Sequence, residues 1–198
     1  MTQSRGQPEG AFGESSVDDR IIQATLALIA QSGLGAVTMR NIAETARISH
    51  QTLYNHYSDI DSIVTEAIAR HNRESITLVE SSIWVAESPE DKIGQLARHA
   101  VSIGVHAHHA AGIAHGLSAA ARATLSEYDE ALEASIRKIL EEGQKTGAFR
   151  PDLALDVDAP LLRHMLNGLA EQAAETPDKA AALATTGART ILAAIKES

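Results

Sequence analysis

Two short amphipathic segments joined by a tight turn, within residues 38–57, most constrain how this chain can fold. Each begins with a hydroxyl residue, Thr38 or Ser49, of the kind that caps a helix N-terminus. The first segment runs to Ala46, three residues before the second cap, and the second runs through Leu53 towards Tyr57. Two short helices with so short a joint predict a helix-turn-helix.

The apolar and polar residues of this motif lie on different faces. The positions spaced to pack one helix on the other are Ile42, Ala43, Ala46, Ile48 and Leu53. The second helix then presents side chains of a size that reaches base edges in a major groove, namely His50, Gln51, Tyr54 and Asn55. The types that bind phosphate oxygens are Ser49, Thr52, Tyr54 and His56. On spacing alone, an ordinary helical hairpin with a polar face remains an alternative.

A longer stretch around the motif resembles a known family. Residues 20–68, RIIQATLALIAQSGLGAVTMRNIAETARISHQTLYNHYSDIDSIVTEAI, resemble the DNA-binding region of TetR-type transcriptional repressors. The later stretch GAFRPDLALDVDAPLLRHMLNGLAE is similar to the loop and helix that lead into the dimerising helix pair of that family. The resemblance implies a homodimer whose two motifs bind successive major grooves of a palindromic operator. It also implies a small molecule in the C-terminal domain that tilts the long helix.

The resemblance also assigns roles to individual residues. It implies that Thr38 and Arg40 contact the DNA backbone or bases from the first motif helix. It implies base contacts for His50, Gln51 and Asn55, and phosphate contacts for Ser49, Thr52, Tyr54 and His56.

Two positions depart from the family pattern. Arg47 stands in the turn, where glycine is common, and must adopt the turn without the freedom of glycine, although it adds charge near the DNA. Ile60 stands where the family commonly has a phosphate-binding lysine.

The rest of the chain also predicts helices, and no segment has the pattern of a strand. Ser16 or Asp18 is suited to cap a first helix, which Gly33 ends in a left-handed C-cap. A long uninterrupted helix follows Asp59 or Asp61. Further helices are expected from Ser88 towards 121, over 125–147, from Pro160 and from Pro177. The expected class is all-α, with a disordered tail over 1–16, a three-helix DNA-binding domain over 17–62, and a ligand-binding and dimerisation domain over 63–198.

Charge and composition exclude several classes of protein. The chain has no cysteine, so a disulfide scaffold, a thiol enzyme and a cysteine zinc site are excluded. The net charge of −9 argues against coating nucleic acid by charge alone. Residues 20–57 are the net-positive part, with Arg20, Arg40 and Arg47 against Glu44. No stretch is apolar enough to span a membrane, and no signal pattern begins the chain, so a cytoplasmic location is expected.

The C-terminal part offers weaker signals for a ligand. A pocket for the unknown small molecule is expected to include aromatic, histidine and amide side chains from Trp84, His106, His109, His115, Tyr128 and Asn167. Five histidines fall between His99 and His115, but no His-x3-His or HExxH pattern occurs, so neither a metal nor another cofactor is expected. A face carrying Ala181, Ala184 and Gly187 predicts a dimer through the last two helices, 160–174 and 177–196.

One alternative from a different class stays open at this point. No catalytic set can be assigned by spacing, so the chain is not expected to be an enzyme. It could still be an all-helical enzyme or a small-molecule carrier whose N-terminal hairpin is structural. That reading predicts a bound substrate without affinity for operator DNA, so a gel shift separates the two.

Overall fold

The structure, a computed structural model, describes residues 16–106 and 116–196, and within these ranges it is helical with no strand. This confirms the expected all-α class. The α-helices are α1 (Val17–Ser32), α2 (Met39–Ala46), α3 (His50–His56), α4 (Ile60–Trp84), α5 (Pro89–His106), α6 (Ala119–Thr146), α7 (Leu155–Glu175) and α8 (Ala180–Ile195). Two short 3-10 turns, η1 (Leu34–Ala36) and η3 (Pro177–Lys179), complete the described elements. Apart from Ser16, the tail expected over 1–16 lies outside the described residues.

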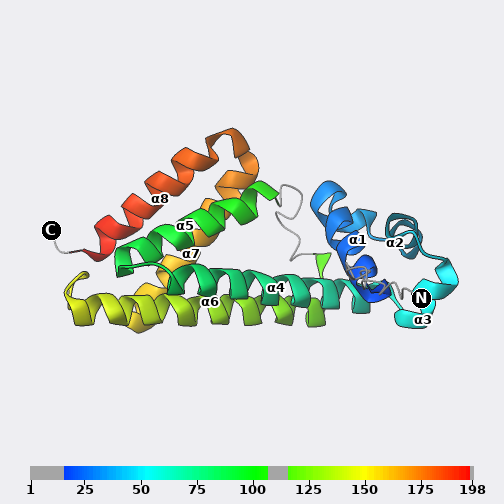
Figure 1. The fold of residues 1–198 in the computed structure, drawn as a ribbon, viewed down its shortest axis with the longest axis horizontal. Coiled ribbons are helices and arrows are strands. Elements are labelled where there is room, and N and C mark those ends of the chain that lie inside the picture. The colour runs from blue at the N-terminus through cyan, green and yellow to red at the C-terminus, as the bar shows by residue number, and fades with distance from the viewer. Residues whose placement is uncertain (1–15, 107–115, 197–198) are drawn as a thin grey trace, which may run out of the picture.

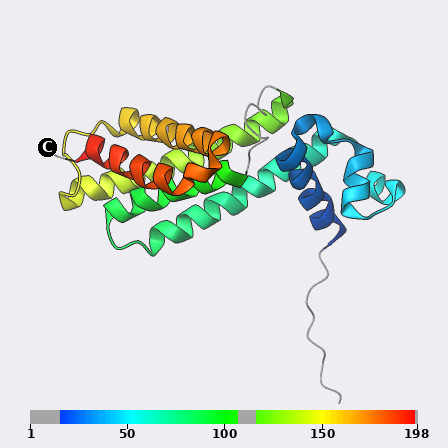
Figure 2. The same ribbon diagram turned by 90° about the horizontal axis from the view of Figure 1, so that it is seen from above.

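The helices form an elongated molecule. Helices α1, α2 and α3 gather at one end, whereas α5, α7 and α8 lie at the other, and the long helices α4 and α6 run side by side beneath them (Figure 1). Seen from above, α1–α3 form a compact group around the first turns of α4 (Figure 2). At 25 residues α4 is about 37 Å long, so it links the two ends without a break.

The predicted helix caps are confirmed by hydrogen bonds. The hydroxyl of Thr38 accepts the N–H of Asn41 at 3.1 Å, and that of Ser49 accepts the N–H of Thr52 at 3.0 Å. Ser16 begins α1 and therefore belongs to the folded part of the chain. Because side-chain oxygens satisfy donors that the first turn leaves unpaired, α1, α2 and α3 start where the sequence predicts.

Two separate apolar clusters hold the molecule together, and α4 contributes to both. The N-terminal cluster includes Ile21, Ile42 and Leu53 together with Ile63 and residues up to Ile68 of α4. The C-terminal cluster draws on α5–α8 and takes Val79 from the far half of α4. The domain boundary expected after residue 62 therefore falls within a continuous helix, and the division into two domains remains a proposal.

Three expected helix features are wrong. Helix α7 begins at Leu155, five residues before Pro160, because the carboxylate of Asp158 accepts the N–H of Ala154 at 2.7 Å and starts the helix earlier. Helix α6 begins at Ala119 rather than 125, because the Ser118 hydroxyl caps it. Gly33 has the expected positive φ of 74°, but its ψ of 176° leads the chain onward instead of closing a left-handed cap.

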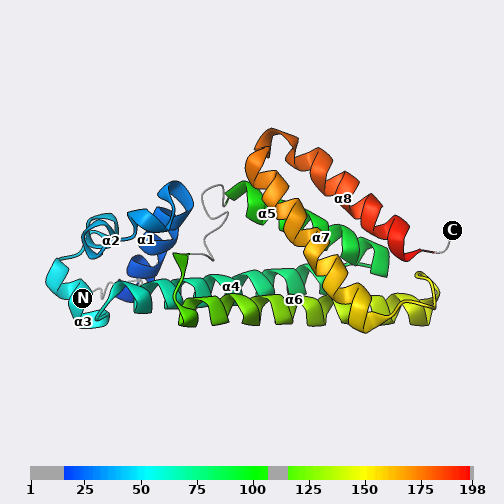
Figure 3. The ribbon, with the colours of Figure 1, turned by 180° about the vertical axis from the view of Figure 1, so that it is seen from behind.

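The expected face of α8 also needs correction. Gly187 does not share an outward face with Ala181, because it packs against the side chain of Leu169 on α7, where a Cβ would come within 2.4 Å of that leucine. Ala181, in contrast, is exposed. Helices α7 and α8 join in a hairpin around η3 (Figure 3). Gly187 therefore serves the packing of α8 on α7 within one chain.

Candidate DNA-binding surface and effector cavity

The turn between α2 and α3 is held by an arginine in the left-handed conformation. Arg47 has φ 54° and ψ 50°, and it is the one non-glycine residue with positive φ in the described part of the chain. Its N–H donates to the carbonyl of Glu44 at 3.2 Å, and the next N–H, of Ile48, donates to Ala43 at 3.0 Å. Arg47 therefore does adopt the turn without the freedom of glycine, and the two helices meet over buried Ile42 and Leu53.

The outward face of α3 carries four exposed polar side chains from His50, Gln51, Tyr54 and Asn55. The amide nitrogen of Gln51 donates to the side-chain oxygen of Asn55 at 3.0 Å. This bond leaves the carbonyl of Gln51 and the amide nitrogen of Asn55 as one acceptor and one donor on the same face. Such a pair matches the hydrogen-bonding edge that adenine presents in the major groove.

The hydroxyl candidates are already fixed by the caps. The oxygens of Ser49 and Thr52 lie 2.8 Å apart, and Ser49 also caps α3, while Thr38 caps α2. Each hydroxyl group is thus held at the start of a motif helix. Tyr54 is 53% exposed, so its phenol is accessible to a phosphate.

Two charged candidates have acidic partners within the domain. The guanidinium Nε of Arg40 donates to Glu44 at 2.9 Å, and this carboxylate raises the pKa of Arg40. The imidazole Nδ1 of His56 lies 2.8 Å from a carboxylate oxygen of Asp18 on α1. The sequence motif could not reveal the second pair, because its residues lie 38 positions apart.

Ile60 lies in the first turn of α4, directly after the cap residue Asp59, and is 37% exposed. The Asp59 carboxylate accepts the N–H of Ser62 at 2.8 Å, and this bond, together with one from Ser58, lowers the pKa of Asp59. Ile60 is therefore not a core residue, although it stands where a phosphate-binding lysine would be expected.

In the C-terminal half, α5, α6 and α7 enclose a small cavity of about 70 Å³. Of the six residues expected around a ligand, it brings together Tyr128 and Asn167. The side chains of Trp84 and His106, and the whole of His109 and His115, lie outside what the structure describes. The remaining lining residues are Leu96, His99, Ala100, Ile103, Leu132, Leu166 and Ala170.

His99 is the polar residue that the sequence prediction of this cavity missed. Its Nε2 atom is buried, and within the described residues nothing lies at hydrogen-bonding distance from it. Burial, and to a lesser extent the nearby charge of His71, lower its pKa. Burial also raises the pKa of Tyr128 to about 12. The lining is therefore uncharged at neutral pH. The spacing of His99 in the sequence could have identified it, because it follows Leu96 by three residues and precedes Ile103 by four, as residues on one helix face do.

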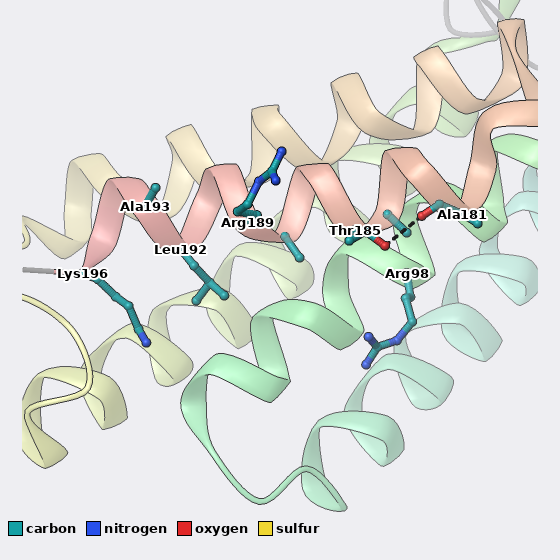
Figure 4. A pocket seen from close by; sticks show the side chains of 9 residues that line it. Arg98, Ala181, Thr185, Arg189, Leu192, Ala193 and Lys196 are labelled. Carbon is teal, nitrogen blue, oxygen red and sulfur yellow. Dashed lines mark hydrogen bonds between the residues drawn. The ribbon is translucent and has the colours of Figure 1, made fainter.

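Three further observations concern metals, the surface and membranes. Within residues 16–106 and 116–196, no three His, Asp or Glu side chains are grouped closely enough to hold a metal ion. A shallow groove of about 770 Å³ runs along the outside of α8, and its lining includes Arg98 of α5 together with Thr185 and Leu192 of α8 (Figure 4). No helix of the described residues is both long and apolar enough to cross a bilayer.

The chain is similar in sequence and in fold to known transcriptional regulators. Residues 21–67 match the family model of bacterial regulatory proteins, tetR family. The HTH-type transcriptional repressor KstR2 of Mycolicibacterium smegmatis is 28% identical over 156 residues, which cover 76% of each chain. Two solved structures share the fold. A putative transcriptional regulator from Saccharomonospora viridis, in complex with choline, has a TM-score of 0.81 at 19% identity, covering 93% of this chain and 100% of that one. FadR from Bacillus subtilis, in complex with stearoyl-CoA, has a TM-score of 0.75 at 17% identity, covering 87% and 96%.

Proposed function

The chain is a TetR-type transcriptional regulator, and from this premise we propose that it is a homodimeric repressor that a small molecule releases from a palindromic operator in the cytoplasm. The observation that carries the proposal is the exposed face of α3. That face carries paired amides at Gln51 and Asn55 inside the segment that matches the family model. The alternative of an enzyme or carrier with a structural hairpin is not favoured, because that hairpin is the part that matches.

Exposed apolar and small residues on the last two helices support a dimer. Val157 and Leu161 on α7 are 57% and 54% exposed, and Gly168, two turns further, has open space where its Cβ would be. On α8 the exposed residues are mostly small: Ala181, Ala182, Thr185, Thr186, Thr190, Ala193 and Ala194. A twin pair of helices can pack closely on such a surface as a four-helix bundle. A dimer with two-fold symmetry binds a site with the same symmetry, hence a palindrome.

The cavity between α5, α6 and α7 supports the role of the small molecule. It is mostly apolar, and its polar groups, His99, Tyr128 and Asn167, are neutral near pH 7. The effector that we propose therefore places an uncharged, largely apolar part there, with one hydrogen-bonding group facing His99. Choline and stearoyl-CoA are ligands of the two similar proteins, and they support only a small-molecule site in this type of domain.

Selection from a random pool of DNA duplexes tests the operator part of the proposal. The wild-type protein should enrich a palindromic sequence, and a gel shift should show that a scrambled duplex binds far more weakly. Failure to enrich any sequence would favour the enzyme or carrier alternative. An effector must then change both the thermal midpoint of the protein and its operator affinity, because effector binding and operator binding are linked equilibria.

Light scattering tests the dimer separately. The chain has a mass of 21.0 kDa, and the wild-type particle should have twice that mass. Leu161→Asp should produce monomers, because a buried unpaired carboxylate is costly at an interface. Leu78→Asp is the matched control, since Leu78, at 62%, is at least as exposed as Leu161 but lies on α4. Equal masses for the two variants would contradict the proposed interface.

A further inference from the structure

The first turn of α1 contacts two other helices through consecutive acidic residues. Asp18 pairs with His56, the last residue of α3, at 2.8 Å. Asp19 pairs with Arg70, which lies in the first half of α4. The two partners are 51 positions apart in the chain. One turn of helix thus joins the helix that presents the amides to the helix that runs towards the cavity.

This turn is itself held in place. The N–H of Asp19 donates to the Ser16 hydroxyl at 3.0 Å, and the N–H of Ser16 donates back to the Asp19 carboxylate at 3.1 Å, which forms a capping box. The second oxygen of that carboxylate accepts from Arg70. Hydrogen bonds from Ser16 and Arg70 lower the pKa of Asp19, so the carboxylate stays charged. Ile21 and Ile22 follow after Arg20 and are completely buried.

Helix α3, in contrast, has few anchors of its own. It has seven residues, and Leu53 is the buried one among them. Its N-terminal end is fixed by the turn at Arg47, and Tyr57, which ends the helix, packs against the N-terminal apolar cluster. His56 adds a contact to α1 through Asp18, and the adjacent Tyr57 is half-buried. Burial raises the pKa of Tyr57, with a smaller contribution from the charge of Asp18.

We propose that Asp18 and Asp19 are positioning residues that fix the orientation of α3 relative to α4, so that sequence-specific DNA binding depends on them. This inference rests on the proposed DNA-binding function. It gives His56 the role of an anchor for α3, in place of the phosphate contact implied by family resemblance.

Charge alone predicts the opposite effect of removing Asp18. A carboxylate near DNA repels phosphates, so its neutralisation should tighten binding to every duplex. If Asp18 instead positions α3, its neutralisation weakens binding to the selected operator while binding to scrambled DNA stays unchanged or tightens. The ratio of the two affinities therefore separates the two explanations, and a purely structural role in folding would not produce it.

The experiment compares Asp18→Asn with Asp61→Asn, which removes the same charge from an exposed position in the first turn of α4. Dissociation constants are measured for the operator selected from random DNA and for a scrambled duplex. For Asp18→Asn we expect a two- to five-fold weaker operator complex, about the effect of weakening one exposed polar contact. For Asp61→Asn we expect equal or tighter binding to both duplexes. Tighter binding of both duplexes by Asp18→Asn would overturn the inference.

The link to α4 is tested with Arg70→Met, and Arg73→Met serves as its control. Arg73 pairs with Glu66 at 3.0 Å, and both of these residues lie on α4. We expect Arg70→Met to weaken operator binding to a similar extent and to add little to Asp18→Asn in the double variant, because both act by positioning the same first turn of α1. Full additivity would contradict a shared role for that turn. Wild-type protein that selects no duplex would instead contradict the proposed function.

Discussion

The carbonyl oxygen of Ala170 on α7 lies 2.0 Å from the place where a Cβ on Gly104 of α5 would stand. The two backbones are therefore in direct contact beside the cavity. Gly104→Ala must push the helices apart, and we expect it to lower the free energy of unfolding by about 1–3 kcal/mol. Gly94→Ala on the same helix is the control, because its Cβ would meet only the flexible end of Arg98 at 3.4 Å. Thermal melting of both variants checks the prediction, and equal midpoints would contradict it.

Arg47→Gly should change stability and DNA affinity in opposite directions. A non-glycine residue in the left-handed conformation is strained, so glycine there should stabilise the fold by about 0.5–1 kcal/mol. The loss of a charge beside the DNA should lower the slope of log K against log salt by about 0.9. Thermal midpoints and salt titrations measure the two effects. Arg47→Lys, which keeps both the charge and the strain, should change neither; a lower midpoint for the glycine variant would show that the strain is negligible.

Ile60→Lys should tighten binding to all duplexes, because it adds a cation in the first turn of α4. One additional phosphate contact should steepen the salt slope by about 0.9. Since Ile60 is already more than one-third exposed, little apolar burial is lost and the thermal midpoint should hardly change. An unchanged slope together with a lower midpoint would show that the side chain packs against its neighbours and does not face phosphate.

Gln51→Ala and Tyr54→Phe should differ in specificity. Gln51 carries the acceptor of the amide pair, so its loss should weaken the selected operator by about 1–3 kcal/mol and scrambled DNA much less. Tyr54→Phe removes only a hydroxyl group that we assign to phosphate, and it should weaken both duplexes similarly. Titration of each variant against both duplexes measures this, and identical behaviour would mean that the base and phosphate assignments are wrong.

The stability of the C-terminal half should fall in mild acid because of His99. Its pKa is lowered by burial, so the folded state accepts a proton less readily than the unfolded chain, in which the ordinary value is 6.5. The stabilisation is complete above that value and is lost as the pH falls through it towards the lower folded pKa. Denaturant unfolding at pH 7.5 and 5.0 should show a smaller loss for His99→Gln than for wild type. The exposed His164→Gln variant on α7 should retain the full loss.

The local features of the fold could be predicted from the sequence, and the contacts between distant residues could not. The hydroxyls of Thr38 and Ser49 each accept the backbone N–H of the residue three positions later. Because this contact is local, the motif and its two helices follow from the spacing of the residues. The outward face of α3 follows for the same reason. The pairing of Asp18 with His56 requires α1 and α3 to meet, and no local pattern encodes this.

Packing between helices explains the remaining errors. The sequence predicts an outward face for Gly187 because alanine and glycine suit any close contact, whether within a chain or between chains, and the structure packs it against Leu169. Proline is the usual start signal of a helix, yet α7 begins before Pro160 is reached, where the carboxylate of Asp158 accepts the N–H of the cap residue Ala154. The cavity at His99 needed three helices to be placed together before its lining could be identified.

The continuity of α4 makes it a lever arm. It is anchored in one apolar cluster by Ile63 and in the other by Val79, and no flexible linker in it can absorb movement between them. A rotation of about 5° at one end would displace the other end of a helix of this length by roughly 3 Å. That displacement approaches the rise of one base pair, so a change too small to rearrange either cluster would still shift the amides of α3 relative to the bases that they face.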